Sequence, residues 1–496
     1  MRVRLLVVAS LFLFVGAAVP VTLAQDSKRS SALATALRER PSAAQKVWVF
    51  FRDKGSDAAA RMGTVSLSPR ARARRALRGD TRGVTLEDVP LMPSYVDAVA
   101  ARVGHVRQQV AWLNAMSFEA SATQVADVEA LPFVARVDLV RGYRRRPEDD
   151  LLGRASVDLG PAGPVKRTHP AIPAALPALA PALDYGPSAG QLTQIDVPAA
   201  HEMGLHGEGV MVAVFDTGFD TLFHEAFAAM SIVDRHDFVN GDDDVANGRD
   251  RGEGSHGTET LSVLGGWAPG HLIGPAFNAT FLLAKTEDTS SETPVEEDNW
   301  AAAAQWAEAR GADVISSSLG YLTYDPGFPS YTADDMNGQT AISTRAADLA
   351  GERGVVVVNS AGNAGASTLH NTLGAPADGR LVLTVGAVTS VGARASFSSV
   401  GPTVDGRTKP DVAAQGVAVI AAAPGTPSGY TSVSGTSFSC PLTAGVVALL
   451  LQARPTATVS EVENALRATA SQAGRPDNLL GWGIVDAAKA VQSIAP

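Results

Sequence analysis

The chain has 496 residues but a single cysteine, Cys440. One thiol excludes an intramolecular disulfide, so packing and polar contacts must hold the folded protein together. A lone cysteine next to a predicted apolar helix is typical of a small core residue, and we expect Cys440 to be one rather than a nucleophile.

Positive charge is also in short supply, with 41 Lys and Arg against 51 Asp and Glu and a net charge of −10. This balance argues against nucleic acid as the main partner. Basic runs lie early, at 70–75 and 144–146, and acidic runs lie later, at 242–244 and 296–298. We hypothesise that the early and late parts attract each other; solvated faces are the alternative.

Long apolar runs are scarce as well, and the longest occupies residues 5–19. Arg2 and Arg4 precede it and small residues end at Ala24, which is typical of a secretory signal peptide over 1–24. An uncleaved anchor is the weaker alternative because the run is short for a membrane span. We therefore expect a secreted or periplasmic protein without stable membrane insertion.

Composition divides the rest of the chain into four parts. Residues 25–45 form a polar lead-in, and 46–145 mix strand-like and helix-like stretches in a small α+β domain. A Pro/Ala-rich linker covers 146–183, and 184–496 form a larger domain. Within the small domain we expect strands at 46–51, 112–120 and 134–140 and helices at 68–78 and 122–130.

The larger domain alternates short apolar runs with helical stretches, a pattern that predicts an α/β fold with a mostly parallel central sheet covered on both faces. The runs lie at 210–215, 280–284, 314–315, 355–358 and 381–385, and the helices at 300–310, 341–352 and 442–453. Ligands of such sheets bind at the carboxyl ends of the strands. Asp216 and Asn363 each follow one of the runs, so we expect a site there.

Asp216 lies in an Asp-Thr-Gly motif and could cap a turn. Aspartic protease chemistry needs two such carboxylates, and the chain has one Asp-Thr-Gly. His256, in Gly-Ser-His-Gly-Thr, precedes a predicted helix at 259–264, whose dipole would favour a neutral base. A packing or capping histidine is the alternative, which the flanking glycines disfavour.

Ser437 precedes the predicted helix at 442–451, with Pro441 expected in its first turn. A serine there could be merely an N-cap. An acid, a base and a hydroxyl together are what acyl transfer by a serine nucleophile requires. The Asn363 amide could stabilise an oxyanion, although Asn beside Gly is also a common turn signal.

With these motifs in view, residues 184–490 resemble the subtilisin-like serine proteases, the subtilase family. The resemblance implies the three-layer fold of that family, with Asp216, His256 and Ser437 as the catalytic triad and Asn363 as the oxyanion donor. It also implies substrate-binding residues along a backbone-pairing strand and a pocket wall: Ser318, Leu319, Gly320, Ser360, Ala361 and Gly362. Residues 46–140 are similar to the propeptide that assists folding and plugs the cleft.

Many relatives hold structural calcium. Asp237, Asp242, Asp243 and Asp244 form an oxygen-rich stretch that could bind a hard cation, but their spacing matches no motif and a solvated acidic loop is favoured. We expect no metal ligand at the site and no cofactor for the chemistry.

The sequence therefore predicts an exported endopeptidase, a monomer, that acts on proteins or peptides and is made as a precursor inhibited by its own propeptide. One alternative is an inactive pseudo-protease that binds peptides along Ser318–Gly320. Another is an esterase, but the Gly-x-Ser-x-Gly elbow and residue order of that class are not those found here.

Overall fold

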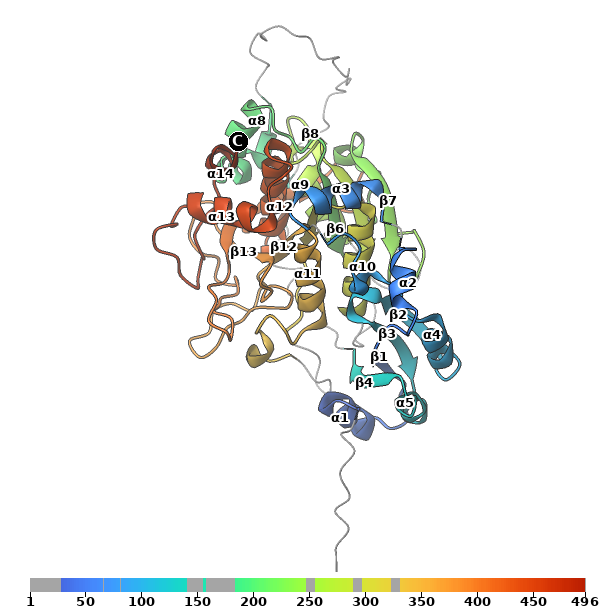
Figure 1. Cartoon of the computed structure of the whole chain (residues 1–496). Helices are drawn as coiled ribbons and strands as arrows, with labels where there is room; N and C mark the ends of the chain where they lie inside the picture. The colour runs from blue at the N-terminus through green and yellow to red at the C-terminus, as the bar shows by residue number, and fades with distance from the viewer. Residues whose placement is uncertain are drawn as a thin grey trace, which may run out of the picture.

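The computed structural model describes residues 28–65, 67–80, 82–140, 155–157, 183–246, 255–288, 297–322 and 331–495. The predicted signal peptide, most of the predicted linker at 146–183 and the basic run at 144–146 lie outside these residues. We call residues 28–140 the small unit and residues 183–495 the large unit (Figure 1).

A seven-stranded sheet forms the centre of the large unit, and every neighbouring pair of its strands is parallel. The strand order is β14 (Val412–Gln415), β13 (Val382–Val388), β12 (Val356–Ser360), β11 (Val314–Ser317), β6 (Met211–Asp216), β10 (Thr280–Lys285) and β7 (Ser231–Asp237). The five predicted apolar runs are all strands, so the predicted α/β fold class is confirmed. We call the two ends of the strands the carboxyl edge and the amino edge of the sheet.

Helices cover both faces of this sheet and complete the three predicted layers (Figure 1). One face carries α9 (Ser255–Gly265), α12 (Thr436–Ala453), α13 (Val459–Thr469), α14 (Ala487–Ile494) and the short α7 (Ala189–Thr193) and α8 (Val197–Glu202). The other carries α10 (Glu297–Arg310) and α11 (Ile342–Glu352). Among the described residues one helix, α12, has the length and apolarity of a membrane span, and it is packed in this core.

Two minor sheets complete the large unit. In one, β15 (Val419–Ala422) and β16 (Tyr430–Val433) pair antiparallel, and β5 (Ala155–Val157) adds to β16. In the other, β8 (Trp267–Ala268) pairs with β9 (Leu272–Ile273).

The small unit combines strands and helices, as predicted, and its sheet is antiparallel. Its strand order is β2 (His105–Val110), β3 (Ala115–Ala120), β1 (Gln45–Phe51) and β4 (Val134–Leu139). Its helices are α1 (Ser31–Glu39), α2 (Ala58–Met62), α3 (Pro69–Leu77), α4 (Pro93–Ala100) and α5 (Ala122–Glu129). The expectation of one strand over 112–120 is wrong, because residues 111–113 form a helical turn and Asn114 is left-handed with φ 49°.

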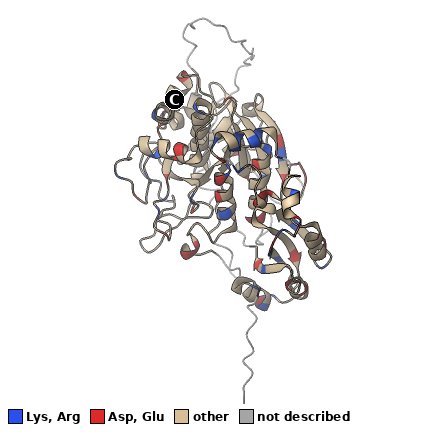
Figure 2. Cartoon of the chain, in the orientation of Figure 1, with Lys and Arg blue, Asp and Glu red and all other residues tan. Residues whose placement is uncertain are grey.

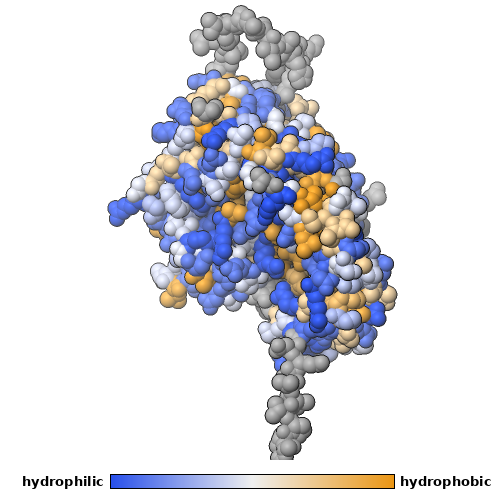
Figure 3. Space-filling model, in the orientation of Figure 1, coloured by the Kyte–Doolittle hydropathy of each residue, from blue (hydrophilic) through white to orange (hydrophobic). Residues whose placement is uncertain are grey.

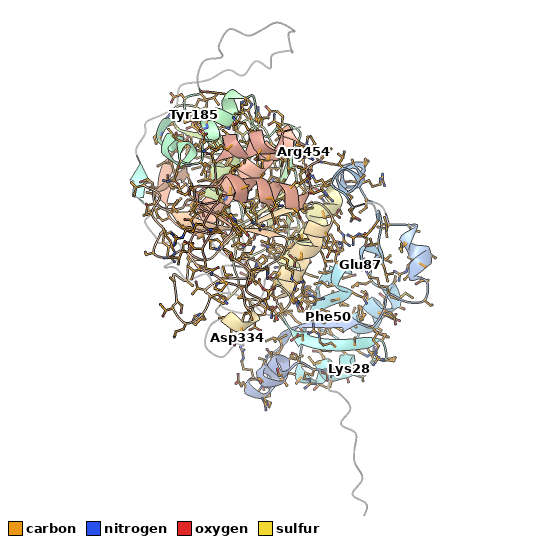
Figure 4. All side chains as sticks on the ribbon, turned by 60° about the vertical axis from the view of Figure 1, so that its left-hand side comes forward. Lys28, Phe50, Glu87, Tyr185, Asp334 and Arg454 are labelled. Carbon is orange, nitrogen blue, oxygen red and sulfur yellow. The ribbon has the colours of Figure 1, made fainter. Side chains whose placement is uncertain are left out.

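The polar lead-in contributes α1, whose Leu33, Ala36 and Leu37 are buried in the core between the small sheet and its helices. The other face of the small sheet packs against α10 and α11. Trp48 and Phe50 of β1 are buried there among alanines of both helices. Figure 4 shows Phe50 where the two units meet.

Charge also joins the units, which confirms part of the predicted attraction. Arg107 of β2 pairs with Asp298, a buried residue of the acidic run at 296–298, at 2.8 Å. Arg74 of α3 pairs with Glu308, and Arg78, the C-cap residue of α3, pairs with Asp313. Figure 2 shows basic residues gathered along α3. Over the face drawn in Figure 3, hydrophilic and apolar residues are interspersed on both units.

Candidate active site

Asp216 and His256 are held together at the carboxyl edge of the large sheet. Asp216 is the last residue of β6 and is fully buried. Its Oδ1 lies 2.6 Å from Nδ1 of His256, and it also accepts a hydrogen bond from the backbone N–H of Thr217 at 2.8 Å. The other oxygen, Oδ2, accepts from the Thr260 hydroxyl at 2.8 Å. Both carboxylate oxygens are thus fixed, and they fix the imidazole plane.

His256 lies within α9, which begins at Ser255, so the expectation that the helix starts at 259 is wrong. Thr260 follows His256 by one helical turn, and residues at this spacing share a helix face. This i, i+4 spacing is the signal in the sequence that could have identified Thr260 as a partner of Asp216.

Ser437 lies in the first turn of α12, which begins at Thr436 rather than near 442 as expected. Pro441 is therefore inside the helix, where it lacks the N–H that would bond to the carbonyl of residue 437. That carbonyl instead accepts a hydrogen bond from the Ser318 hydroxyl at 2.7 Å. Because Pro441 cannot donate to the Ser437 carbonyl, this carbonyl is available to bind Ser318, the residue that follows β11.

Helices α9 and α12 pack side by side in the same core, which places His256 next to the start of α12. The ring centroids of His256 and Phe438 are 5.5 Å apart, and Phe438 directly follows Ser437. Both His256 and Ser437 are buried, with exposed fractions of 3% and 5%. The structure therefore brings the acid, the base and the hydroxyl to one place.

Asn363 lies on the loop that follows β12 and faces the same helix start. Its Oδ1 accepts from the backbone N–H of Thr436 at 3.0 Å and from the Thr436 hydroxyl at 2.9 Å. Because the carbonyl oxygen is used in this way, the amide group Nδ2 is the end left to act as a donor. Gly435, next to Nδ2, has φ 150°, a backbone conformation that residues with a Cβ rarely adopt.

The six residues implied as substrate-binding follow two adjacent strands. Ser318, Leu319 and Gly320 come directly after β11, and Ser360 ends β12. The carbonyl of Leu319 accepts from the Ser360 hydroxyl at 3.3 Å.

Beyond Ser360, the N–H of Ala361 donates to the carbonyl of Val385 at 2.9 Å, and that of Gly362 donates to the Thr436 hydroxyl at 3.3 Å. All ten predicted residues therefore belong to one connected region. Thr436 was not predicted as a site residue. Its hydroxyl donates to Asn363, which lies 73 residues away in the sequence.

Cys440 is fully buried behind this site. Burial raises the pKa of its thiol to about 12, so the thiolate that a cysteine nucleophile needs is not formed at neutral pH. The expectation that Cys440 is a core residue is confirmed.

Residues 242–244 are exposed, as the favoured interpretation of a solvated acidic loop predicts, and two of the four acidic side chains have side-chain partners. Asp237 is fully buried and accepts from Nζ of Lys285 at 2.9 Å, and Asp243 lies 2.9 Å from Nδ1 of His236. Over the ranges that the structure describes, no group of three His, Cys, Asp or Glu side chains is placed to hold a metal ion. The possibility of structural calcium therefore stays untested, and the described residues offer no such group of ligands for it.

Comparison with known proteins identifies relatives of both units. Residues 207–483 match the Subtilase family (peptidase S8), and residues 46–150 match a peptidase S8 propeptide domain of Bacteroidota. Subtilisin DY of Bacillus licheniformis is 33% identical over 289 residues, which are 58% of this chain and 93% of that protein. Subtilisin Savinase of Lederbergia lenta is 33% identical over 301 residues, 61% of this chain and 97% of that protein.

A solved structure shows the same fold. Fervidolysin from Fervidobacterium pennivorans aligns with a TM-score of 0.62 and 23% identity, over 91% of this chain and 61% of its own length. Fold and relatives together define a serine-type endopeptidase with an N-terminal propeptide domain. Since the family match spans more than half of the residues, the chain belongs to the subtilase family.

Proposed function

We propose that Asp216, His256 and Ser437 form the catalytic triad of a secreted or periplasmic endopeptidase that hydrolyses proteins or peptides. The hydrogen bond of 2.6 Å between Asp216 Oδ1 and His256 Nδ1 carries this proposal. It keeps the proton on Nδ1 and the lone pair on Nε2, the tautomer that a general base requires.

In the reaction, His256 Nε2 takes the proton of Ser437 Oγ as this oxygen attacks the scissile carbonyl. Asp216 stabilises the imidazolium that forms, and the proton then passes to the leaving amine. Nδ2 of Asn363 and the backbone N–H of Ser437 stabilise the oxyanion, helped by the positive end of α12. Water hydrolyses the acyl-enzyme by the same steps, and no cofactor is needed.

The propeptide domain acts as an intramolecular inhibitor in this proposal. This proposal is supported by the packing of the small unit against α10 and α11 of the large unit. Trp48 and Phe50 of β1 are buried at this contact between the two units. Export would follow from the signal peptide predicted at residues 1–24, and the active form would be a monomer.

The test compares two variants of α12 in the processed protein, Ser437→Ala and Cys440→Ala. Removing the nucleophile should abolish casein hydrolysis, whereas removing the buried thiol should leave kcat within about twofold. Equal hydrolysis by Ser437→Ala and the parent would contradict the triad. A folded parent that binds peptides but cuts none would identify a pseudo-protease instead.

A further inference from the structure

Helix α3 of the small unit carries arginines that insert into the amino edge of the large sheet, the edge opposite the triad. Arg74, Arg75 and Arg78 are buried, although arginine is rarely buried without partners. Arg72, on the same helix, is exposed. The alternative interpretation of the basic run, a solvated helix face, predicts exposed arginines. It does not explain why these three guanidinium groups are buried.

Arg74 is bound mainly by groups of the large unit at the end of α10. It donates to the carbonyl of Ala312 at 2.7 Å and to that of Glu308 at 3.2 Å, and it pairs with the Glu308 carboxylate. Arg75 also donates to that carboxylate, at 2.8 and 2.9 Å. The Glu308 side chain is only 2% exposed, so its charge depends on these arginines for compensation.

Arg78 and Arg70 both bind Asp313, the residue directly before β11. Arg78 donates to Oδ1 of Asp313 at 2.8 Å and to the carbonyl of Gly354 at 2.8 Å. Arg70, which is half-exposed, pairs with the other carboxylate oxygen of Asp313 and donates to the carbonyl of Gly311 at 3.0 Å. All these acceptors belong to the large unit.

The backbone of the large unit is shaped for this contact. A Cβ at Gly311 would lie 2.7 Å from Cβ of Arg70, and one at Gly354 would lie 3.0 Å from Cβ of Arg78. Both glycines have positive φ, 97° and 81°. Glycine at both positions therefore allows α3 to lie directly against the ends of two loops.

We propose that the amino edge of the large sheet is a guanidinium-binding site, built from Glu308, Asp313 and neighbouring carbonyls, whose ligand is α3. This site retains the small unit after the connection between the units is cut. The inference rests on the proposed role of the small unit as a cleavable propeptide, but not on catalysis.

The contact made by α3 is one of several between the two units. Near the α3 contact, Asp88 of the small unit also pairs with Arg353 at 3.0 Å. A separate charged contact, between Arg107 and Asp298, lies at the start of α10, and Glu308 lies ten residues further along the same helix. At 1.5 Å per residue the two contacts are about 15 Å apart. The small unit thus holds α10 near both ends, and its α3 contact lies at the edge of the sheet opposite Asp216.

The test uses the full chain with Ser437→Ala, a C-terminal tag for immobilisation and a site-specific protease sequence inserted between residues 158 and 182. After cutting, the rate at which the small unit leaves the immobilised large unit is measured. Arg74→Gln should speed release on the order of 10²-fold, since it removes one of the two guanidinium groups that compensate the buried Glu308 carboxylate. Arg72→Gln, the matched control on α3, should stay within about twofold of the parent.

Far-UV circular dichroism and the unfolding midpoint of each uncut precursor show whether a variant folds. If Arg74→Gln does not, the half-exposed Arg70→Gln and the acceptor variant Glu308→Gln provide the same comparison. In a double-mutant cycle, Arg74→Gln should add less to the release rate when Glu308→Gln is already present. Release rates equal to that of Arg72→Gln in all buried-site variants would overturn the proposal, whether or not the triad is catalytic.

Discussion

The two edges of the large sheet are built from different kinds of polar group. At the carboxyl edge, one buried pair, Asp216 and His256, lies among hydroxyls and carbonyls. Imidazole is the side-chain group whose ordinary pKa lies nearest neutrality. At the amino edge the acceptors face arginines, which stay charged. Burial lowers the pKa of Arg74 only to about 10.

In the functions proposed above, one sheet keeps proton transfer apart from retention of the small unit. Hydroxyl and imidazole groups suit the first task, and fixed charges suit the second. A substitution at the carboxyl edge should therefore change catalysis and leave retention of the small unit unchanged. A substitution at the amino edge should do the reverse.

The largest effect is expected for Asp216→Asn, which keeps the shape of the side chain but selects the wrong histidine tautomer. kcat should fall about 10⁴-fold, while release of the small unit from the cut complex stays unchanged. Asp234→Asn, at an exposed pair with Arg310, is the control and should leave both values unchanged. A fall of less than tenfold in kcat would argue against the assigned role of Asp216.

Asn363→Ala should come next, because it removes the side-chain donor to the oxyanion. A loss of about 10²–10³-fold in kcat with little change in KM is expected, a magnitude measured in another member of this family. Asn278→Ala, on the exposed surface, is the matched control. An effect confined to KM would show that Asn363 binds substrate rather than the transition state.

Acid should loosen the contact between the units. Burial alone would raise the pKa of Asp298, but Arg107 and the Ser117 hydroxyl outweigh it and hold the pKa below its usual value. This lowered pKa stabilises the complex above about pH 4, and that contribution is lost as the pH falls through the value in the complex.

Release from the cut Ser437→Ala complex, measured between pH 7 and pH 3, should therefore accelerate by up to about tenfold per pH unit below about 4. The Arg107→Gln variant should show a flatter profile. Slower release in acid than at neutral pH would contradict the assignment.

The smallest effect is expected for Thr260→Val, which removes one hydrogen bond to Asp216 Oδ2. A loss of about 1 kcal/mol corresponds to about a fivefold fall in kcat/KM. Thr260→Ser keeps the hydroxyl and should recover most of the activity. Equal activities of the Val and Ser variants would mean that the hydroxyl plays no part.

Much of the carboxyl edge could be predicted because its signals are local. Five strands were visible as apolar runs, and Asp216 and Asn363 follow two of them. The start of α12 was placed too late, since Pro441 indicates a first turn when read alone. Strand β7 was not predicted; it is an edge strand whose side chains alternate between exposed and half-buried.

The amino edge could not be predicted in the same way. The basic run was visible and its helix was expected, but the partners of Arg74 and Arg78 lie more than 230 residues away. Glu308 and Asp313 belong to no acidic run, and carbonyl acceptors leave no trace in the sequence. Only the packing of α3 against the ends of two loops identifies the site.

The central claim is that Ser437 is activated by His256 at the carboxyl edge. A serine-directed fluorophosphonate, with the labelled peptide identified by mass spectrometry, tests it most directly. A single label on Ser437 is expected in the processed parent and in Arg72→Gln, and no label is expected in His256→Ala. A label on another residue, or equal labelling of Ser437 in the His256→Ala variant, would contradict it.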